Sequence, residues 1–218
     1  MPETVALVVA AGRGARMPGD IPKQYRDLQG RSILRHVLEA FSAHASVSHV
    51  QAVIHPDDAE QFAPAARGLG PGDPVLGGAT RQESVRNGLA VVPDSVAIVL
   101  VHDGARPLAS DSVFRGVIAA VADGADAAVP AVPVVDSIRH RAQGALDRSP
   151  LVAVQTPQGF VADRLRAAHA SGADASDDAT LVEADGGSVV VVDGDAANLK
   201  ITSPLDLQIA ELLLGESS

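Results

Sequence analysis

An apolar run near the N-terminus leads into a segment that combines glycines with positive charge: Ala10-Ala11-Gly12-Arg13-Gly14-Ala15-Arg16-Met17 and then Pro22-Lys23-Gln24-Tyr25. Four cations stand in this stretch against one acid, Asp20, and they are Arg13, Arg16, Lys23 and Arg26. Glycines let backbone N–H groups approach a phosphate chain closely, and fixed cations neutralise its charge. The segment therefore predicts a binding site for a phosphorylated ligand.

The scarcity of lysine singles out two positions. The chain contains only two lysines, Lys23 and Lys200, beside fifteen arginines. A compact ammonium and a planar guanidinium are not interchangeable, so lysines that persist in an arginine-rich chain indicate places where the ammonium itself is needed. Lys23 belongs to the glycine-bearing segment, and Lys200 is its candidate counterpart elsewhere in the site.

Several other chemistries fit the sequence poorly. A dinucleotide fingerprint requires a third glycine where Met17 stands, and a Walker A loop requires a Gly-Lys-Ser/Thr sequence that is missing. There is no Gly-x-Ser-x-Gly nucleophile elbow. The seven histidines lack the spacing of metal ligands, and the absence of cysteine excludes disulfides and thiol catalysis.

Composition limits the class of protein and its partners. A chain of 218 residues is long enough for one large domain, 1–218, with a proper core. Because 46% of residues are hydrophobic but only 2% aromatic, that core must be mainly aliphatic. The formal charge of −10 and the lack of a basic block argue against nucleic-acid binding. Small phosphorylated ligands remain possible because they require only local cations.

The sequence carries no evident signal for export or membrane insertion. The apolar run at residues 5–11 is short, follows Glu3, and lacks the charged lead of a signal peptide. No other stretch approaches the length of a membrane span. We therefore expect a cytoplasmic protein without membrane contact.

Short apolar runs alternate with stretches of helical periodicity. We expect strands at residues 5–10, 50–54, 74–76, 96–101, 127–132 and 188–192. We expect helices at residues 32–44, 57–67 and 110–122, after a capping box at Thr80 and Glu83, from Phe160, and from Ser203-Pro204. This order predicts an α/β, Rossmann-like fold with a mostly parallel sheet flanked by helices. Ligands bind such sheets beyond the carboxyl ends of the strands, here after Ala10, Leu76 and Val101.

The alternation breaks between residues 133 and 156. Two β-like runs, Val134–Ile138 and Leu151–Val154, are joined by a polar link that contains glycine. This pattern predicts a β-hairpin arm that projects from the main sheet. A further stretch rich in Ala, Gly and Asp, Ser171–Asp178, is expected to be a loop.

The full spacing of the first segment, with Arg16 and Lys23 both present, resembles the nucleotidyltransferase signature. It is most similar to the cytidylyltransferases that act on 2-C-methyl-D-erythritol 4-phosphate. Four further blocks resemble the same family in order, and they begin at Gly77, Val101, Gln155 and Asn198. The resemblance covers nearly the whole chain and implies the nucleotidyltransferase fold.

The resemblance implies transfer of CMP from CTP to methylerythritol phosphate, a step of isoprenoid precursor synthesis that releases pyrophosphate and uses Mg²⁺. It implies catalytic roles for Arg16 and Lys23. Nucleotide binding would fall to the first segment and to the block that cradles cytosine, with Ala10, Ala11, Gly12, Gly14, Gly78, Ser84 and Asp103. The acceptor would contact Asp103, Arg106, Ser137, Arg148, Thr156 and Lys200. Asp103 is also a possible metal ligand, Mg²⁺ being held mainly by the phosphates of CTP.

In the similar enzymes, the arms of two subunits cross and lend an arginine and a hydroxyl to the partner's substrate. This implies a homodimer through arm exchange, with Arg148 and Ser137 acting across subunits. The family usually has alanine at Gly104 and an aromatic residue at Gly159, so we expect looser turns at both. His102 is interpreted as structural.

Two alternatives to this function remain open. A cytidylyltransferase for another polyol phosphate, such as ribitol 5-phosphate, would share much of the nucleotide side. A non-catalytic nucleotide-binding or dinucleotide-dependent protein could use a similar sheet. The missing third glycine argues against the dinucleotide version, and Arg16 with Lys23 argues against an inactive one.

Overall fold

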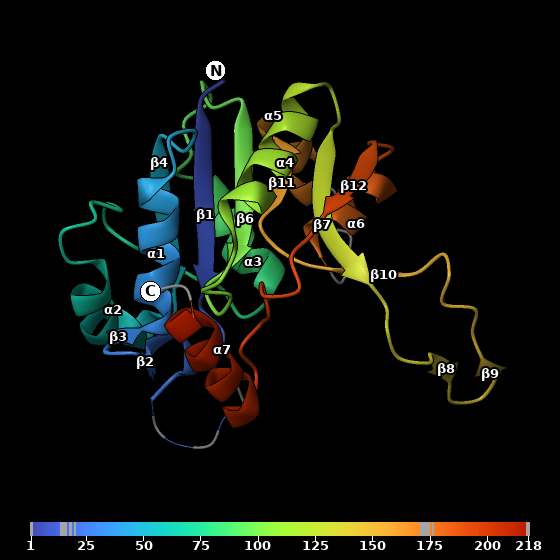
Figure 1. Cartoon of the computed structure of the whole chain (residues 1–218). Coiled ribbons are helices and arrows are strands. Elements are labelled where there is room, and N and C mark those ends of the chain that lie inside the picture. The colour runs from blue at the N-terminus through green and yellow to red at the C-terminus, as the bar shows by residue number, and fades with distance from the viewer. Residues whose placement is uncertain are drawn as a thin grey trace.

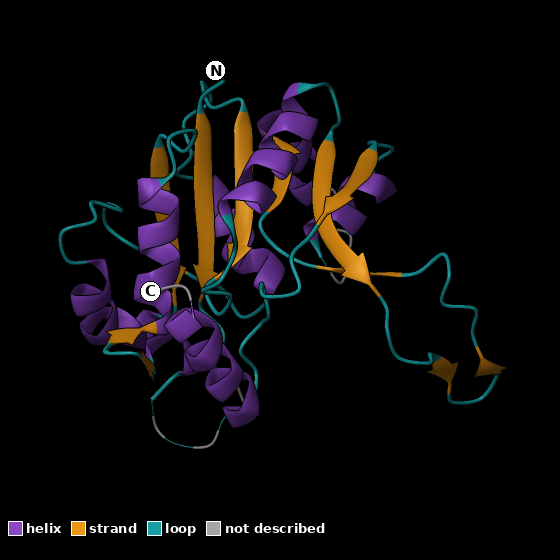
Figure 2. Cartoon of the chain, in the orientation of Figure 1, coloured by secondary structure: helices purple, strands orange, loops and turns teal. Residues whose placement is uncertain are grey.

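The computed structural model describes residues 2–13, 17, 19, 21–170, 175 and 177–215, and the backbone of residue 216. One large sheet runs through the molecule with helices on both faces (Figures 1 and 2). Its strands are β1 (Thr4–Ala10), β4 (His49–Ile54), β5 (Val75–Leu76), β6 (Ile98–Asp103), β7 (Ala127–Pro133), β10 (Val152–Val154), β11 (Gln158–Val161) and β12 (Val189–Asp193). Two small hairpins add β2 (Asp27–Leu28) with β3 (Arg31–Ser32), and β8 (Arg139–His140) with β9 (Gly144–Ala145).

The helices are α1 (Ile33–Ala43), α2 (Ala59–Ala66), α3 (Arg81–Leu89), α4 (Asp111–Ala122), α5 (Ala162–Ala170), α6 (Asp178–Ala184) and α7 (Pro204–Glu216), with 3₁₀ turns at Lys23–Tyr25 and Pro56–Asp58. The sheet order is β10-β7-β11-β6-β1-β4-β5, and β12 also pairs with β7. The pairs β1–β4, β1–β6, β4–β5 and β7–β12 are parallel, whereas β11 and β10 run antiparallel to their neighbours. The predicted mostly parallel α/β sheet is confirmed.

The central strand β1 is buried on both faces, as its continuous apolar sequence predicts. Ala6 and Val8 face a core built with α1, α2 and α4. Val5 and Leu7 face the opposite core, built with α3, α5 and α6. Side chains of a strand alternate between faces, so one apolar run supports both helical layers. The predicted aliphatic character holds, with three fully buried phenylalanines, one each on α1, α4 and β11.

The structure corrects the sequence interpretation after residue 156. Helix was expected from Phe160, but Phe160 is a fully buried residue of strand β11, and α5 begins at Ala162. A four-residue strand is too short for its periodicity to separate it from a buried helical turn. Pairing with both β6 and β7 therefore decides this segment.

The arm at residues 133–156 projects from the edge of the sheet (Figure 1). The expected pairing of its two apolar runs is wrong. Val152–Val154 instead pairs with the main-sheet strand β7, and the short β8–β9 hairpin forms inside the polar link. Backbone pairing with a sheet edge thus continues the main sheet into the base of the arm.

Helix α7 lies beyond the carboxyl end of β1 (Figure 1). A small separate core joins this helix to the first segment of the chain, through Met17, Leu28, Ile33, Ile201 and Ala210. The segment that carries Lys200 is therefore packed beside the segment that carries Lys23. No helix in the described part of the chain is long and apolar enough to cross a membrane.

Candidate active site

A cavity of about 430 Å³ lies at the carboxyl ends of β1 and β6. Its walls bring together eight of the residues expected at the site: Ala10, Ala11, Gly12, Lys23, Gly78, Ser84, Asp103 and Lys200. They come from the ends of two strands, the 3₁₀ turn after the first segment, the start of α3, and the stretch before α7. Parallel strands end at one edge of a sheet, which is why distant blocks of sequence meet there.

One wall of the cavity is formed by the segment that enters α3. The Gly78 N–H donates to the Ser84 hydroxyl at 3.1 Å, and that hydroxyl donates to the Thr80 carbonyl at 2.9 Å. Thr80 and Glu83 form the predicted capping box. A Cβ at Gly77 would lie 2.4 Å from the Ala11 Cβ, so only glycine lets this wall approach the first segment so closely.

The opposite wall is formed by the first segment and its 3₁₀ turn. The expected residues Gly14 and Arg16 lie outside the described residues. The Lys23 ammonium donates to the Ile201 carbonyl at 3.2 Å, next to Lys200. Gln24, which sequence reasoning missed, donates to the Ala10 carbonyl at 2.7 Å and so fixes the end of β1.

Arg13 was expected among the cations of this segment, and it does line the cavity. Its guanidinium also contacts the 3₁₀ turn after β4, at 2.5 Å from Asp57 and 2.8 Å from the His55 Nδ1. The nearby Asp58 carboxylate is 1% exposed and lies 3.4 Å from the same guanidinium. Acids thus compensate the charge of this cation.

Asp103 occupies the end of β6 and is surrounded by cations. Its Oδ2 lies 2.9 Å from the Lys200 ammonium and 3.4 Å from the Arg106 Nε. Its Oδ1 lies 4.0 Å from the Arg81 Nε. Burial would raise the pKa of Asp103, but attraction to Lys200 first, and then to the two arginines, holds this pKa well below its usual range. Asp103 is therefore ionised at neutral pH.

A hydrogen-bonded chain behind Asp103 fixes its backbone. Burial lowers the pKa of the fully buried His102 to about 4, so its ring is neutral and has one N–H. Its Nε2 faces the Arg106 carbonyl at 3.0 Å and must carry that proton. Its Nδ1 therefore accepts from the Thr156 hydroxyl at 3.1 Å, and the same hydroxyl accepts from the Asp103 N–H, also at 3.1 Å.

Thr156 and Arg106, both expected to touch the acceptor, do not line the cavity and instead contact the residues behind its wall. Thr156 is 5% exposed, and its only hydroxyl proton is committed to His102. Arg106 donates to the Asn198 carbonyl at 2.8 Å, and the buried Asn198 amide donates to the Thr156 carbonyl at 2.9 Å. This network anchors the stretch that presents Lys200, and sequence reasoning missed the role of Asn198 in it.

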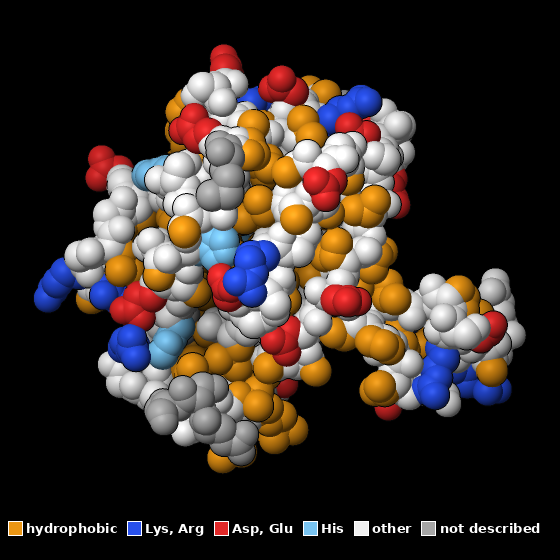
Figure 3. Space-filling view, turned by 45° about the horizontal axis from the view of Figure 1, so that its top comes forward, with side chains coloured by type: hydrophobic (Ala, Val, Ile, Leu, Met, Phe, Trp, Pro, Cys, Tyr) orange, Lys and Arg blue, Asp and Glu red, His pale blue; other side chains and the backbone are white. Residues whose placement is uncertain are grey.

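The two expected arm residues, Ser137 and Arg148, do not reach the cavity of their own chain. Both are exposed on the arm, which extends away from the carboxyl ends of β1 and β6 (Figure 1). In the space-filling view the arm stands off the body and carries basic and hydrophobic side chains side by side (Figure 3). Its hydrophobic side chains include Val135, which is 79% exposed.

Gly104 and Gly159, the two glycines at which the sequence departs from the family pattern, do not lie in loose turns. A Cβ at Gly159 would lie 2.5 Å from the Val117 Cγ1, because β11 packs directly under α4. A Cβ at Gly104 would lie 2.9 Å from the Ala10 Cβ. Both positions are tightly packed, and the expectation of slack there is wrong. Asp103 and Arg106 nevertheless keep their positions on either side of Gly104.

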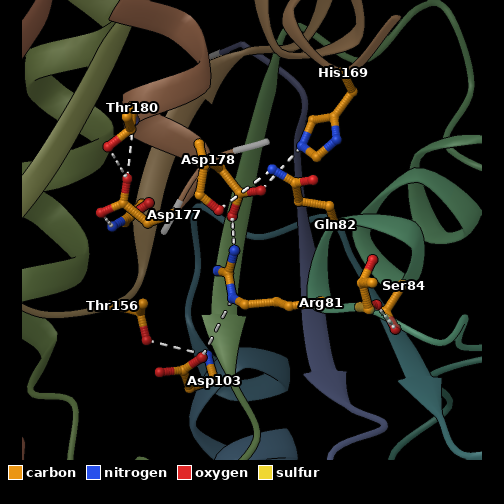
Figure 4. Close-up of polar contacts among 12 residues, drawn as sticks. Arg81, Gln82, Ser84, Asp103, Thr156, His169, Asp177, Asp178 and Thr180 are labelled. Atoms are coloured by element: carbon orange, nitrogen blue, oxygen red, sulfur yellow. Dashed lines mark hydrogen bonds and ion pairs between the residues drawn. The ribbon is translucent and has the colours of Figure 1, made fainter. Parts of the chain in front are cut away.

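Sequence reasoning also missed Arg81 on the cavity wall and two residues behind it, Asp178 and His169. Arg81 lines the cavity, and its guanidinium lies 2.6 Å from the buried Asp178. His169 lies 2.9 Å from the other carboxylate oxygen of Asp178 (Figure 4). Arg81 could have been noticed, since it stands in the second block. Asp178 and His169 carried no signal of their own, because a lone Asp in a loop or a lone His on a helix is usually solvated.

The chain resembles known proteins along nearly its full length. A profile of the family described as 2-C-methyl-D-erythritol 4-phosphate cytidylyltransferase (IspD) matches residues 4–216. A protein of that name from Cereibacter sphaeroides (strain KD131) is 45% identical over 97% of this chain and 96% of its own length. The "Bifunctional enzyme IspD/IspF" of Rhodospirillum rubrum is 48% identical over 98% of this chain, which spans only 57% of that relative.

Solved structures agree with these relatives. The crystal structure of 2-C-methyl-D-erythritol 4-phosphate cytidylyltransferase from Thermus thermophilus has a TM-score of 0.78 and 36% identity, with 99% of this chain and 100% of that chain covered. The 4-diphosphocytidyl-2C-methyl-D-erythritol synthase from Anaerococcus prevotii has a TM-score of 0.85 and 26% identity, with 98% and 99% covered. The five ordered motifs, the sheet and the cavity agree with these matches, and the chain belongs to the 2-C-methyl-D-erythritol 4-phosphate cytidylyltransferase family.

Proposed function

We propose that this chain transfers CMP from CTP to 2-C-methyl-D-erythritol 4-phosphate and releases pyrophosphate. One observation carries the proposal beyond family membership. A single cavity has glycine-bearing walls suited to a nucleotide on one side and the Lys200–Asp103 pair on the other. Two phosphorylated substrates could therefore meet at the carboxyl ends of β1 and β6 with a cation for each.

The chemistry needs no protein base. A phosphate monoester has a second pKa of about 6, so the acceptor phosphate is largely dianionic at neutral pH. One of its oxygens would form a bond to the α-phosphorus of CTP while the bond from that phosphorus to the pyrophosphate oxygen breaks. Negative charge grows on the departing pyrophosphate, and a fixed cation at that position lowers the barrier. Lys23 and, from the family resemblance, Arg16 are assigned this role.

Lys200 and Asp103 are assigned to the acceptor. The Lys200 ammonium lies 2.9 Å from Asp103, which orients it toward the cavity while its side chain remains 39% exposed. An ammonium held in this way can bind the acceptor phosphate or a hydroxyl close to it. Positioning of this kind is the main contribution that a protein makes to phosphoryl transfer.

The residues also fit a divalent cation held chiefly by the nucleotide. The described residues contain no cluster of three or more His, Asp or Glu side chains that could hold a metal alone. Asp103 Oδ1, the oxygen turned away from Lys200 and Arg106, is a hard ligand of the kind that Mg²⁺ prefers. Bound there with the phosphates of CTP, Mg²⁺ would supply charge neutralisation.

We further propose a cytoplasmic homodimer in which each arm reaches the partner's cavity. Ser137 and Arg148 are exposed far from their own cavity, and hydrophobic side chains such as Leu146 and Val152 are exposed near them. Exposed apolar groups on a projecting arm favour burial against a second copy. Light scattering tests the assembly, and a mixed dimer of Lys23→Ala and Arg148→Ala chains should regain activity in one of its two sites.

The direct test is pyrophosphate release from CTP and Mg²⁺ with methylerythritol phosphate or ribitol 5-phosphate as acceptor. Release should require the first acceptor. Lys23→Ala should lower kcat by about 100-fold or more while the Kd for CTP changes far less. Arg115→Ala, which removes a cation 69% exposed on α4, is the matched control and should leave both constants unchanged. Absence of pyrophosphate release with methylerythritol phosphate would overturn the proposed function.

A further inference from the structure

A cluster of polar side chains around the buried Asp178 lies beside the cavity, and the proposed function gives its members no role. Its members are Arg81 at the start of α3, His169 near the end of α5, and Asp178 at the start of α6 (Figure 4). The Asp178 side chain is 0% exposed and that of His169 is 4% exposed. An ionised carboxylate is buried to this degree only where partners compensate its charge.

Arg81 stands between two carboxylates. Its Nη1 lies 2.6 Å from the Asp178 Oδ2, and its Nε lies 4.0 Å from the Asp103 Oδ1. The other oxygen of Asp103 is already engaged by Lys200 at 2.9 Å. Arg81 is therefore the cation on the Oδ1 side of Asp103, the side that is proposed to face the nucleotide and its metal ion.

Asp178 is the stronger partner of Arg81. The shorter separation and complete burial both strengthen its attraction relative to that of Asp103. Burial lowers the pKa of Arg81, but attraction to Asp178, and then to Asp103, outweighs this and raises the pKa above its ordinary value. Arg81 is thus held charged and is withheld from direct contact with Asp103.

The Asp178 carboxylate is itself fixed from two directions. His169 Nε2 lies at hydrogen-bond distance, 2.9 Å, from Oδ1, so Asp178 cannot rotate away from Arg81 without losing this contact. The preceding residue, Asp177, caps α6 by accepting from the Thr180 N–H at 2.9 Å. Gln82 donates to the Ala175 carbonyl at 3.3 Å, which adds a second link between α3 and this segment.

We propose that Asp178 and His169 are positioning residues that keep the Arg81 guanidinium out of direct contact with Asp103. Asp103 Oδ1 then stays accessible from the cavity. The inference rests on the proposed function. Without the charge of Asp178, Asp103 is the remaining carboxylate at ion-pair distance from Arg81 among the described residues. It closes on Asp103 Oδ1, and the oxygen needed for substrate or metal is covered.

The principal test compares Asp178→Asn with Asp177→Asn. Both variants remove one negative charge at the start of α6, and asparagine still caps the helix at position 177. Asp178→Asn should lower kcat by about tenfold or more with less than about threefold change in the KM for CTP, whereas Asp177→Asn should change kcat less than about twofold. Equal kcat values for the two variants overturn the proposal.

His169 offers a second variant that leaves every charge of Arg81 and Asp178 in place. His169→Gln keeps a donor near the position of Nε2 and should retain kcat within about twofold of the parent. His169→Leu removes the donor and should lower kcat by about threefold or more. If Asp178→Asn fails to fold, this pair carries the same test, and equal activity of the two variants contradicts the proposal.

A double-mutant comparison with Arg81 tests whether Asp178 affects kcat by positioning Arg81 or by a general effect on folding. In an Arg81→Gln background, Asp178→Asn should cause no further loss of kcat, because it acts through Arg81. If Asp178→Asn lowers kcat by the same factor in the Arg81→Gln background as in the parent, the proposed mechanism is wrong.

A substrate-free crystal structure of Asp178→Asn gives a readout independent of turnover. The distance from the Arg81 Nε to the Asp103 Oδ1 should fall below its present 4.0 Å, and an unchanged distance overturns the proposal. If the parent protein transfers no CMP, the proposed function fails, yet this structural test still decides the role of Asp178.

Discussion

Acidification should destabilise the protein through His102, a residue that stands behind the site rather than in it. The ring is fully buried, packs edge-on against Phe41 with ring centroids 4.9 Å apart, and is neutral because burial lowers its pKa to about 4. In the unfolded chain a histidine has a pKa of about 6.5. In this pH range the unfolded chain binds a proton at His102 and the folded protein does not. The free energy of unfolding therefore falls as the pH drops from about 6.5 toward 4.

The size of the effect follows from the two pKa values. Between pH 7.5 and 5.5 the unfolded form gains most of one proton while folded His102 gains almost none, so the free energy of unfolding should fall by about 1.4 kcal/mol. Asp103 adds nothing in this window, because its pKa lies below the usual range and its carboxylate stays ionised. The loss should grow to about 2.6 kcal/mol by pH 4.5.

The assay is urea unfolding of the parent and of His102→Gln at pH 7.5 and 5.5. Glutamine can still donate to the Arg106 carbonyl and accept from Thr156, but it does not titrate. The variant starts from a lower stability, yet between the two pH values it should lose about 1.4 kcal/mol less than the parent. The other histidines contribute equally to both proteins and cancel in this difference. Parallel pH dependences would refute the assignment of a buried neutral ring.

Three further predictions concern packing and charge. Gly78→Ala places a Cβ 2.3 Å from the Glu83 Cβ, so it should disturb the capping box and raise the KM for CTP by about tenfold. Gly116→Ala on α4 is the control: its Cβ would meet only Val192, at 4.0 Å, and the kinetics should not change. Gly159→Ala should cost about 1–3 kcal/mol in urea unfolding because of Val117, and Val117→Ala in the same chain should recover part of it; full stability of the single variant would contradict the packing argument. Lys200→Arg should lower kcat/KM for the acceptor by about tenfold while the Kd for CTP holds, and unchanged kinetics would show that any cation suffices.

Much of the fold could be predicted because its strands are continuous apolar runs. The run ending at Ala10 is buried on both faces as expected, and residues 98–103 form β6 close to the predicted central strand. Prediction failed where a segment is short and its pairing is not local. The strand at 158–161 is defined by antiparallel partners on two sides. In the arm, the sequence predicts that the two apolar runs pair with each other, but Val152–Val154 pairs with β7.

The site divides in a similar way. Motifs with fixed spacing located the segments that line the cavity, including Lys23, Ser84, Asp103 and Lys200. No spacing could show that Thr156 commits its hydroxyl proton to His102, or that Asn198 links Arg106 to the stretch carrying Lys200. These contacts join residues from different elements, and only packing brings them within hydrogen-bond distance.

By itself, the sequence determined that this chain is an α/β protein, and it predicted a phosphate site from two lysines and several glycines that the structure brings to one cavity. Residue type and local spacing suffice for that, because charge, backbone freedom and strand burial are properties of short segments. The tertiary structure alone decided that Lys23 lies beside the carbonyl of Ile201, and that Arg81 is shared between Asp103 and the buried Asp178. Such distances depend on how helices from opposite ends of the chain pack on one sheet, and hydrophobic burial, not local sequence, fixes that packing.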